Sequence, residues 1–470
     1  MEQINLLNQI KVRNVHFIGI GGISMSGLAE ILLSLGFNVS GSDIKSSDIT
    51  AKLMEKGITV YTGHESKNIE GAQLVVYTAA IDAQNPELVR AKELKIPIME
   101  RASLLGKIME GYPSSIAVSG THGKTTTTSM ISMIMLKAAL DPTIHIGGVL
   151  DAIGGNTRIG GNNYFLVEAC EYVESFLKLR PYMAIILNIE ADHLDYFRGI
   201  EHIKDAFLKF IAPIPKNGHI IACVDDKNVC AVLKNTEHNK ITYGINSPEA
   251  IFKAKNISFN EEGLASFSVF MYDKEIIANL QLGVPGIHNI SNSLAAIAAC
   301  YTLGCDIKSI KDGIESFTGT HRRYELKGIV DNIKVVDDYA HHPTEIAATL
   351  KAARNGNYQR VWSVFQPHTY TRTKHLLSDF VESFEDSDRI IVADIYSARE
   401  VDRGEIHSRT LAEKISQNGK DVLYLPDFDE IVEYLKENAS PGDLILTMGA
   451  GDIYKVGEMF LKEKEMIAVS

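Results

Sequence analysis

The residues in this sequence that point most clearly to chemistry are Gly120-Thr121-His122-Gly123-Lys124-Thr125, which follow an apolar run. We expect residues 115–119 to form a strand and the threonine-rich segment from Thr125 onward to form a helix. Glycines let such a loop fold around an anion, and the amides at the start of the helix add positive potential. In this pattern Lys124 reaches the β- and γ-phosphates of a nucleotide, and the hydroxyl of Thr125 binds Mg²⁺. One position departs from the general phosphate-loop pattern, since Val118 stands where a first glycine is usual.

Two further apolar runs end in groups that suit phosphoryl transfer. Residues 165–167 are followed by Glu168 and Glu171, and residues 184–187 are followed by Asn188, Asp192 and His193. The carboxyl ends of parallel strands gather at one edge of a sheet, so we expect these groups near the phosphate loop. Carboxylate and imidazole there are suitable ligands for Mg²⁺.

A second glycine loop occurs near the N-terminus, within GIGGISMSG at residues 19–27. Gly19 and Gly21 fit the first two positions of the dinucleotide fingerprint G-x-G-x-x-G, but Ser24 stands at the third. Asp43 ends the next apolar run, at about the distance where NAD-binding folds place the acid that holds the ribose. The residues alone leave three interpretations open: an NAD site, a site for another nucleotide, and a tight turn without a ligand.

Four more polar clusters stand at expected strand ends, helix starts or domain starts, where ligand-binding side chains are expected rather than core residues. In the cluster GIHNISN, Asn289 could also be only the N-cap of a helix. His341 and His342 precede Pro343 and invite a zinc interpretation, but no partner stands at ligand spacing, so we expect no zinc there. The clusters are GIHNISN (286–292), HRRYE (321–325), DDYAHHP (337–343) and FQPHTYTRT (365–373).

Composition narrows the class of protein. The chain is 45% hydrophobic and 23% charged, and 47 basic against 59 acidic residues give a net charge of −12. Such a balance argues against a protein that coats nucleic acid, because neutralising phosphates requires clustered Lys and Arg. Five scattered cysteines without a CxxC pair read as reduced thiols. The N-terminal residues lack a signal peptide's pattern and the most apolar segment is too short to span a bilayer, so we expect a cytoplasmic protein without membrane insertion.

Short apolar runs alternate with helical patterns almost throughout, which is typical of α/β domains built on parallel sheets. The exception is 257–282, which reads as antiparallel strands with a turn at residues 261–263. We therefore expect three α/β domains: a Rossmann-like domain over 1–108, a central phosphate-loop domain with a mixed sheet over 109–319, and a Rossmann-like domain over 320–470.

Taken together, these motifs resemble the Mur ligase family, and the resemblance covers nearly the whole chain. It rests on GIGGISMSGLAEIL with GSD, on GTHGKTTTT, on EACEY, on NIEADHLDYF and on GIHNISN. In the last part of the chain it rests on RRYE, DDYAHHP and FQPHTYTRT.

The resemblance implies an ATP-dependent amide ligase that adds the first amino acid of the peptidoglycan stem peptide. Its expected substrates are UDP-N-acetylmuramate, L-alanine and ATP, with two Mg²⁺ ions and with an acyl phosphate as intermediate. The three domains are then expected to hold the UDP-sugar, to hold ATP, and to bring residues to ATP and the amino acid on closure. We expect no nucleic-acid partner, and either a monomer or a homodimer.

The resemblance also implies roles for individual residues. Lys124 holds the ATP phosphates, Thr125 and Glu168 hold one Mg²⁺, and His193 is a ligand of a second. Lys124, His193, Arg323 and Asp338 form the expected catalytic set, with His193 or Asp338 as a base for the amine. The expected ATP-binding residues are Gly120, Thr121, His122, Gly123, Lys124, Thr125, Thr126, Asn292, Arg323 and Asp338. The expected substrate-binding residues are Gly21, Gly22, Ser24, Asp43, His288, His341, His368 and Arg372.

Some positions depart from the family's patterns. Many members read EADES where this chain has EACEY, which leaves the roles of Cys170 and Glu171 open. The place of the carbamylated lysine used by several members falls near Phe207, so we expect no carbamate. Thr369 stands where some members have Arg.

Rival interpretations are a murein-peptide-recycling ligase, an NAD-dependent dehydrogenase and a non-enzymatic nucleotide sensor. With ATP assigned to the second glycine loop, we expect the first to hold the diphosphate of the sugar nucleotide. The Ser24 hydroxyl would then donate to a phosphate, and Asp43 would contact the uridine end.

Overall fold

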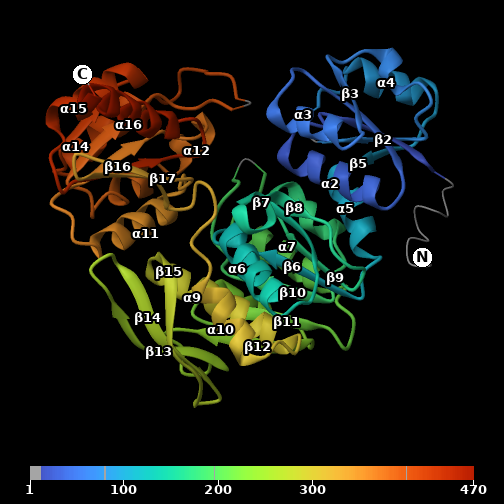
Figure 1. Cartoon of the computed structure of the whole chain (residues 1–470), viewed down its shortest axis with the longest axis horizontal. Helices are drawn as coiled ribbons and strands as arrows, with labels where there is room; N and C mark the ends of the chain where they lie inside the picture. The colour runs from blue at the N-terminus through green and yellow to red at the C-terminus, as the bar shows by residue number, and fades with distance from the viewer. Residues whose placement is uncertain (1–11, 79–80, 195, 399, 470) are drawn as a thin grey trace. The chain divides into compact units, whose positions relative to one another are not determined.

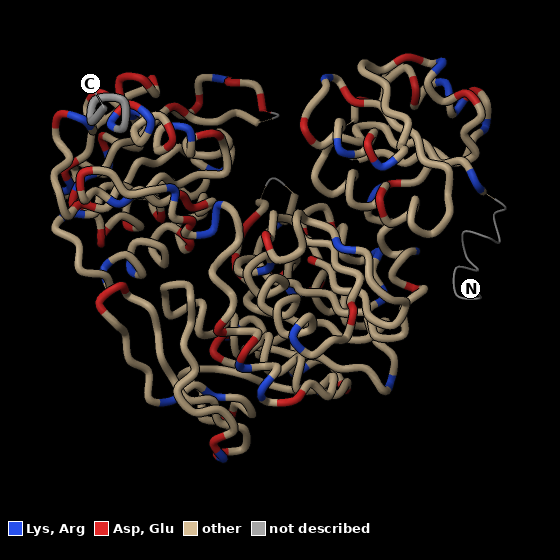
Figure 2. The backbone as a smooth tube through the Cα atoms, viewed as in Figure 1, with Lys and Arg blue, Asp and Glu red and all other residues tan. Residues whose placement is uncertain are grey.

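The computed structural model describes residues 12–78, 81–194, 196–398 and 400–469 of the chain (Figure 1). The chain forms two compact units. The first comprises residues 1–189, 202–242 and 295–313, and the second comprises 190–201, 243–294 and 314–470. Acidic and basic residues are interspersed along the tube in Figure 2. No helix in the described ranges is long and apolar enough to cross a membrane.

The first unit begins with a five-stranded parallel sheet in the order β3-β2-β1-β4-β5. This order is that of a doubly wound nucleotide-binding fold, whose switch point lies beside the carboxyl end of β1. The glycine loop at 19–22 leaves β1 at that end. The strands are β1 (Asn14–Ile18), β2 (Asn38–Asp43), β3 (Thr59–Thr62), β4 (Leu74–Tyr77) and β5 (Ile98–Glu100), with helices α2 (Ile23–Ser34), α3 (Asp48–Glu55), η1 (Ser66–Ile69), α4 (Pro86–Glu93) and α5 (Arg101–Met109). The sequence also has an apolar run at residues 74–81, of which residues 79 and 80 lie outside the described residues.

A second sheet of the first unit runs in the order β12-β11-β10-β6-β9-β7-β8. Strands β11, β10, β6, β9 and β7 are parallel, and β8 is antiparallel to β7. Its elements are β6 (Ser114–Ser119), α6 (Lys124–Lys137), β7 (Thr143–Leu150), η2 (Asp151–Ile153), β8 (Gly155–Arg158), β9 (Tyr164–Glu168), η3 (Tyr172–Lys178), β10 (Met183–Ile186), α7 (Ile200–Ile211), β11 (His219–Cys223), α8 (Lys227–Leu233) and β12 (Asn239–Gly244). The boundary between the units falls within β12, and it also divides α9 (Ile287–Thr302) and α10 (Ile307–Glu315).

Three antiparallel strands of the second unit are β13 (Phe252–Phe259), β14 (Leu264–Met271) and β15 (Lys274–Pro285). The antiparallel strands and the turn expected between residues 257 and 282 are therefore confirmed.

The second unit also holds a six-stranded sheet in the order β16-β17-β21-β18-β19-β20. All its strands are parallel except the edge strand β16. Alternate residues face two hydrophobic clusters: Val336 and Leu446 belong to one, while Val335 and Ile445 belong to the other. Both faces of the sheet are thus covered, as parallel sheets require. The strands are β16 (Glu325–Val330), β17 (Ile333–Asp338), β18 (Val361–Phe365), β19 (Arg389–Val392), β20 (Val422–Tyr424) and β21 (Leu444–Met448), and the helices are α11 (Pro343–Arg354), α12 (Tyr370–His375), α13 (Leu377–Glu382), α14 (Ser408–Gln417), α15 (Phe428–Asn438) and α16 (Tyr454–Val469).

Candidate active site

The loop between β6 and α6 has the backbone that the phosphate-loop pattern predicts. Gly120 and Gly123 have φ values of +140° and +82°, which only glycine adopts without strain. A Cβ on Gly120 would lie 2.9 Å from the Cβ of Leu187, so the loop packs directly on the residues that follow β10. The loop ends at Lys124, the first residue of α6.

Asn188, which follows β10, holds this loop in place. Its Oδ1 accepts from the backbone N–H of His122 at 2.8 Å, and its Nδ2 donates to the His122 carbonyl at 3.2 Å. The backbone carbonyl of Asn188 accepts from the Thr121 N–H at 3.2 Å. The carboxyl ends of β6 and β10 are therefore tied together, as expected from the parallel sheet.

Lys124 is held by acceptors on three residues. Its Nζ donates to the carbonyls of Gly120 and Thr121 at 2.5 and 3.0 Å, and it lies 3.0 Å from Oε2 of Glu171. Burial alone would lower the pKa of Lys124, but the Glu171 carboxylate outweighs this effect and raises the pKa. Lys124 is therefore a fixed, permanently charged cation, and Glu171 is its resident counter-ion.

Thr125 and Glu168 come together at the end of β9. The Thr125 hydroxyl donates to Oε2 of Glu168 at 3.1 Å, and the Gly147 N–H donates to Oε1 at 2.7 Å. A hydroxyl beside a carboxylate is a set of hard oxygen donors, which suits Mg²⁺. The residues present thus fit the metal that the sequence predicts. Thr126, the next residue of α6, is half-buried.

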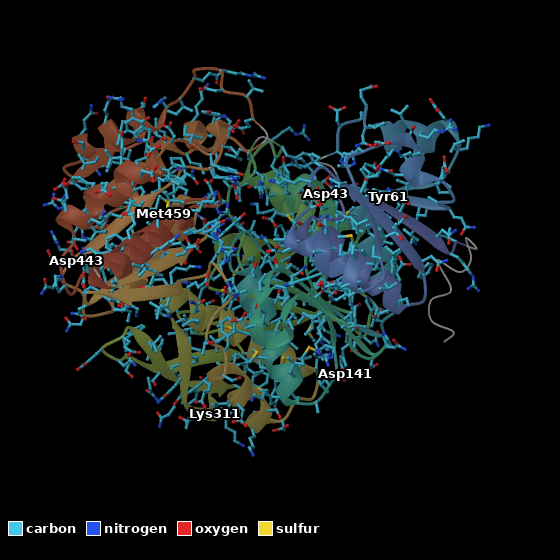
Figure 3. The ribbon with its side chains drawn as sticks, turned by 45° about the horizontal axis from the view of Figure 1, so that its top comes forward. Asp43, Tyr61, Asp141, Lys311, Asp443 and Met459 are labelled. Atoms are coloured by element: carbon cyan, nitrogen blue, oxygen red, sulfur yellow. The ribbon has the colours of Figure 1, made fainter. Side chains whose placement is uncertain are left out.

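The N-terminal glycine loop has a different backbone arrangement. The N–H groups of Gly19 and Ile20 both donate to the carbonyl of Ser42, at 2.8 and 3.0 Å. The Asp43 carboxylate accepts from the Gly21 N–H at 2.8 Å, so this acid fastens the loop to the end of β2. Figure 3 marks Asp43 on β2 and Tyr61 on the neighbouring β3. Contact of Asp43 with uridine stays a prediction, as do the ligand contacts of Gly21 and Gly22.

Ser24, in the first turn of α2, bonds to two side chains that the sequence did not single out. Arg101 Nη1 donates to Ser24 Oγ at 2.9 Å, and His145 Nε2 lies 2.8 Å from the same oxygen. Arg101 begins α5, and His145 comes from β7.

In the second unit, Arg323 and Asp338 are neighbours. The Arg323 guanidinium lies over the Tyr339 ring at 5.1 Å. Asp338 accepts from the N–H groups of Tyr324 and Ala340 at 2.9 and 2.7 Å. Burial raises the pKa of Asp338 to about 7, and the charge of Arg323 offsets only part of that effect.

Asp192 and three predicted substrate-binding residues also cluster in the second unit. Arg372 donates to Asp192 Oδ1 from Nη2 at 3.2 Å, and its Nη1 lies 3.2 Å from His368 Nδ1. The His341 and His368 rings are 5.7 Å apart between centroids. Burial lowers the pKa of His341 to about 3 and that of His368 to about 4, so both rings are neutral at pH 7. Burial alone would raise the pKa of Asp192, but the charges of His193 and Arg372 outweigh it and hold the pKa well below its usual range.

His193 follows Asp192 in a left-handed conformation with φ of +53°. Its Nε2 lies 3.7 Å from the Asp192 carboxylate. A non-glycine residue in this region is strained, which is frequent at functional sites.

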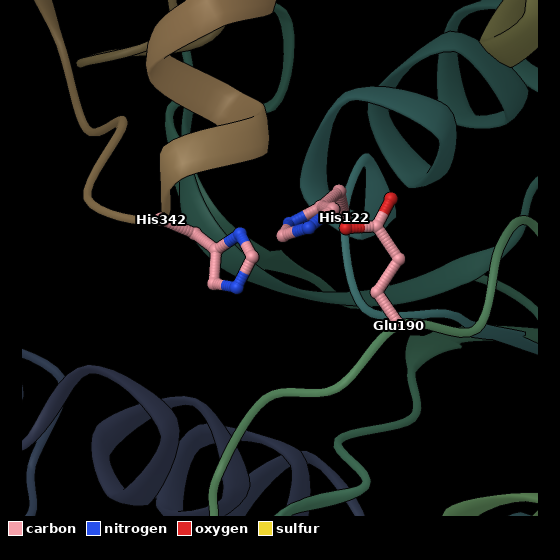
Figure 4. Close-up of side chains that lie close together, drawn as sticks. All are labelled: His122, Glu190 and His342. Carbon is pink, nitrogen blue, oxygen red and sulfur yellow. The ribbon is translucent and has the colours of Figure 1, made fainter. Parts of the chain in front are cut away.

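Glu190 and His342 lie beside the start of α11 (Figure 4). Thr344 donates from its hydroxyl to Oε2 of Glu190 at 2.7 Å. His342 is the N-cap of α11, where its Nδ1 accepts from the Thr344 N–H. This capping role is a structural reason for the second histidine of the pair.

The residues expected at the start of α9 form a small network. Asn292 Nδ2 donates to Asn289 Oδ1 at 3.0 Å, and Asn289 Nδ2 donates to the Pro285 carbonyl at 2.7 Å. Asn289 lies within the helix rather than at its N-cap. A Cβ on Gly286, whose φ is +99°, would lie 2.5 Å from the His288 ring.

The predicted residues divide between the two units. Lys124, Thr125, Glu168, Ser24 and Asp43 belong to the first, whereas the predicted residues from His193 onward belong to the second. Within the first unit, the sequence indicated Glu171 without a role and did not indicate Arg101 or His145 at all. Glu171 lies 47 positions from its partner Lys124, and Arg101 and His145 lie 77 and 121 positions from their partner Ser24. No local spacing in the sequence could therefore reveal these pairs.

Three Mur ligase family models match the chain in succession. They are the Mur ligase family catalytic domain over residues 14–113, the Mur ligase middle domain over 118–300, and the Mur ligase glutamate ligase domain over 322–451. The chain belongs to the Mur ligase family, and the three-domain α/β class expected from the sequence is confirmed.

Within that family, the chain is similar to enzymes named UDP-N-acetylmuramate–L-alanine ligase. It is 70% identical to the one from Acetivibrio thermocellus over 470 residues, which is all of both chains. It is 54% identical to the one from Caldanaerobacter subterraneus over 455 residues, which covers 97% of this chain and 98% of the relative.

Two solved structures are similar over almost their full length. The UDP-N-acetylmuramate–alanine ligase of Thermotoga maritima has a TM-score of 0.80 at 28% identity, with 96% of this chain and 99% of that chain covered. A murein peptide ligase from Psychrobacter arcticus has a TM-score of 0.72 at 27% identity, with 96% and 98% covered.

Proposed function

We propose that this chain is an ATP-dependent ligase that joins L-alanine to the lactyl carboxylate of UDP-N-acetylmuramate, the first step of peptidoglycan stem-peptide assembly. The observation that carries the proposal is the 70% identity, over the full length of both chains, to an enzyme of that name. The geometry of Lys124, Thr125 and Glu168 supports it, because a ligase of this kind must hold a nucleoside triphosphate.

The chemistry needs activation of the carboxylate, since oxide is a poor leaving group. A lactyl carboxylate oxygen attacks the γ-phosphorus of ATP, which forms an acyl phosphate and releases ADP. The amine of alanine then attacks the acyl carbon, and phosphate leaves as the amide forms. Lys124 stabilises the charge on the transferred phosphoryl group in the first step.

Thr125 and Glu168 would hold one Mg²⁺, and His193 would be a ligand of a second. When bound, Mg²⁺ neutralises phosphate charge. The Lys124 ammonium must exchange its bond to Glu171 for bonds to the phosphates. Gly120, Thr121, His122, Gly123 and Thr126 would bind ATP through the loop and the first turn of α6.

The remaining roles are assigned to the second unit. Asn292, Arg323 and Asp338 would complete the ATP site, and His288, His341, His368 and Arg372 would face the amino acid and the sugar nucleotide. A pKa of about 7 leaves much of Asp338 deprotonated at neutral pH, so it can accept the proton of the alanine ammonium. His193 is the other candidate for this base.

The domain roles are part of the same proposal. Residues 1–108 would bind the UDP-sugar, 109–319 would bind ATP, and 320–470 would close over both. Closure excludes water, which would otherwise hydrolyse the acyl phosphate. The cytoplasmic location and the oligomeric state stay predictions.

The test is ADP release by the purified full chain with UDP-N-acetylmuramate and Mg-ATP, in the presence of L-Ala, Gly, L-Ser or the stem tripeptide. We expect release that depends on the amino acid and is fastest with L-Ala. Release only with the tripeptide would instead identify a murein peptide ligase, the class represented by the Psychrobacter structure. The absence of release with every acceptor would refute both functions.

A further inference from the structure

Arg101 is a cation without a carboxylate partner beside the N-terminal glycine loop. Its only hydrogen bond within the described residues runs from Nη1 to Ser24 Oγ at 2.9 Å, and no carboxylate there lies within 4 Å of its guanidinium. Arg101 is half-buried at the start of α5. An arginine in such a place usually has an anionic partner, because its planar fork of donors matches carboxylate and phosphate.

Ser24 lies where an anion bound by the loop would be. It stands in the first turn of α2, whose N-cap Gly22 makes no side-chain cap and whose first turn contains no acid. In the described part of the chain, nothing accepts from the N–H groups of residues 23–25. The loop itself carries no cation, so Arg101 is the positive side chain that reaches it.

His145 contacts the Ser24 hydroxyl from a buried position in β7. Its ring is buried, with 5% of its surface exposed, and bonds to Ser24 Oγ through Nε2 at 2.8 Å and to Thr157 Oγ1 through Nδ1 at 3.1 Å. Burial, followed by the charge of Arg101, lowers the pKa of His145 to about 4, so the ring is neutral and carries one proton. A serine oxygen accepts two hydrogen bonds and donates one. When Nε2 carries the proton, Arg101 and His145 both donate to Ser24 Oγ, and the Ser24 proton is left for a ligand.

Gly27 allows this arrangement to form. A Cβ at residue 27 would lie 2.1 Å from Thr157 Oγ1 and 2.7 Å from His145 Nδ1. Helix α2 therefore approaches β7 and β8 at a position where no side chain fits, and Asn156 of β8 adds a bond to the Ile23 carbonyl at 2.8 Å. This close packing of α2 against β7 and β8 holds Ser24 and His145 in one geometry.

We propose that Arg101 binds the diphosphate of the sugar nucleotide directly, and that His145 is a positioning residue that turns the Ser24 hydroxyl toward the same diphosphate. The inference rests on the proposed function for the identity of the ligand. It adds a cation to a loop that otherwise offers only backbone amides and one hydroxyl. It also makes a residue of β7 part of the sugar-nucleotide site, on the strand whose Gly147 N–H bonds to Glu168.

The test measures binding of UDP and of uridine to the full chain by calorimetry, without ATP or amino acid. In Arg101→Gln we expect the affinity for UDP to fall about 10- to 100-fold, the range for loss of a charge-assisted contact, while the affinity for uridine stays within about twofold. Arg101→Lys keeps the positive charge but lacks the planar fork of donors. Its affinity for UDP should therefore lie between those of Arg101→Gln and the wild type. The matched control is Lys107→Gln on the same helix, whose lysine is ion-paired to Glu110 at 3.3 Å and should leave both affinities unchanged.

The positioning role has its own pair of variants. His145→Ala should lower the affinity for UDP about fivefold or more and leave uridine unaffected, whereas His145→Gln keeps a donor near the position of Nε2 and should restore most of the UDP affinity. Equal loss of UDP and uridine in Arg101→Gln or His145→Ala would indicate a structural defect and overturn the inference.

The two proposals fail in different ways. Unchanged UDP affinity in Arg101→Gln overturns the inference and leaves the ligase function intact. Absence of amino-acid-dependent ADP release in the wild type overturns the ligase function, while the UDP and uridine measurements still decide the role of Arg101.

Discussion

The two glycine loops of the first unit, which we propose to bind phosphate, differ in where their cation comes from. The loop before α6 contains its own cation, Lys124, which is ion-paired to Glu171 within the same sheet edge. The loop before α2 contains none, and the cation that reaches it, Arg101, comes from the start of α5. Their backbones differ as well, since Gly123 at the start of α6 is left-handed whereas Gly22 at the start of α2 is extended. A local motif can therefore reveal the first kind of site in full and the second kind only in part.

Removing the cation from the self-contained loop should have the largest effect. We expect Lys124→Ala to fold and to lose at least ~10³-fold in turnover, by comparison with the loss of other preorganised phosphate contacts. The measurement is amino-acid-dependent ADP release at saturating ATP. Lys137→Ala, which removes an exposed lysine at the end of the same helix, is the control. Turnover of Lys124→Ala within tenfold of the wild type would contradict the ATP-site assignment.

The His145 contact at the other loop should be sensitive to acid. The folded pKa of His145 is about 4, below the ordinary 6.5, so the unfolded chain binds its proton first as the pH falls. Keeping this ring neutral therefore contributes about 3 kcal/mol to the free energy of unfolding. This contribution is fully present above pH 6.5 and is lost as the pH falls toward 4.

Denaturant titrations of the wild type and His145→Gln between pH 7 and 4 measure this effect. The variant should lose less stability over that interval, because it has no proton to bind at residue 145. Parallel curves for the two proteins would show that the ring is not kept neutral by the fold.

The smallest effects should separate the two loop backbones. Gly123→Ala places a Cβ at φ of +82° and should lower the free energy of unfolding by about 1–2 kcal/mol. Gly22→Ala has φ of −66° and only ordinary contacts around a new Cβ, so its stability should stay within about 0.5 kcal/mol of the wild type. Gly22→Ala should act instead on the KM for the sugar nucleotide. Equal destabilisation by the two substitutions would remove the distinction between the loops.

The sequence predicts much of this structure because its signals are local. Alternation of apolar runs and helical patterns predicts the α/β fold, and the run from Gly120 to Thr125 predicts a strand, a loop and a helix in that order. The convergence of Thr125 with Glu168 follows from the rule that parallel strands end at one edge, and the 3.1 Å bond between them agrees with it.

The parts that the sequence does not predict depend on contacts between distant segments. Glu171 was visible as an acid after a strand, but its pairing with Lys124 depends on how the residues after β9 turn back toward the loop. The sequence does not indicate Arg101 or His145, because each contacts Ser24 across 77 or 121 positions of the chain. The close approach of α2 to β7, which Gly27 permits, gives both of them a role.

The division of the chain between its units has a consequence for the order of folding. The first unit is completed only by residues 295–313, and Gly313 of α10 lies so close to Ile134 of α6 that a Cβ there would be 2.6 Å from the Ile134 backbone. During synthesis, the helix that follows the phosphate loop therefore lacks part of its covering until more than 170 further residues have been added. Contacts of such long sequence separation close late and slow folding. A nascent chain stopped before residue 295 would expose the flank of α6, and it is there that we expect chaperones to act on this protein.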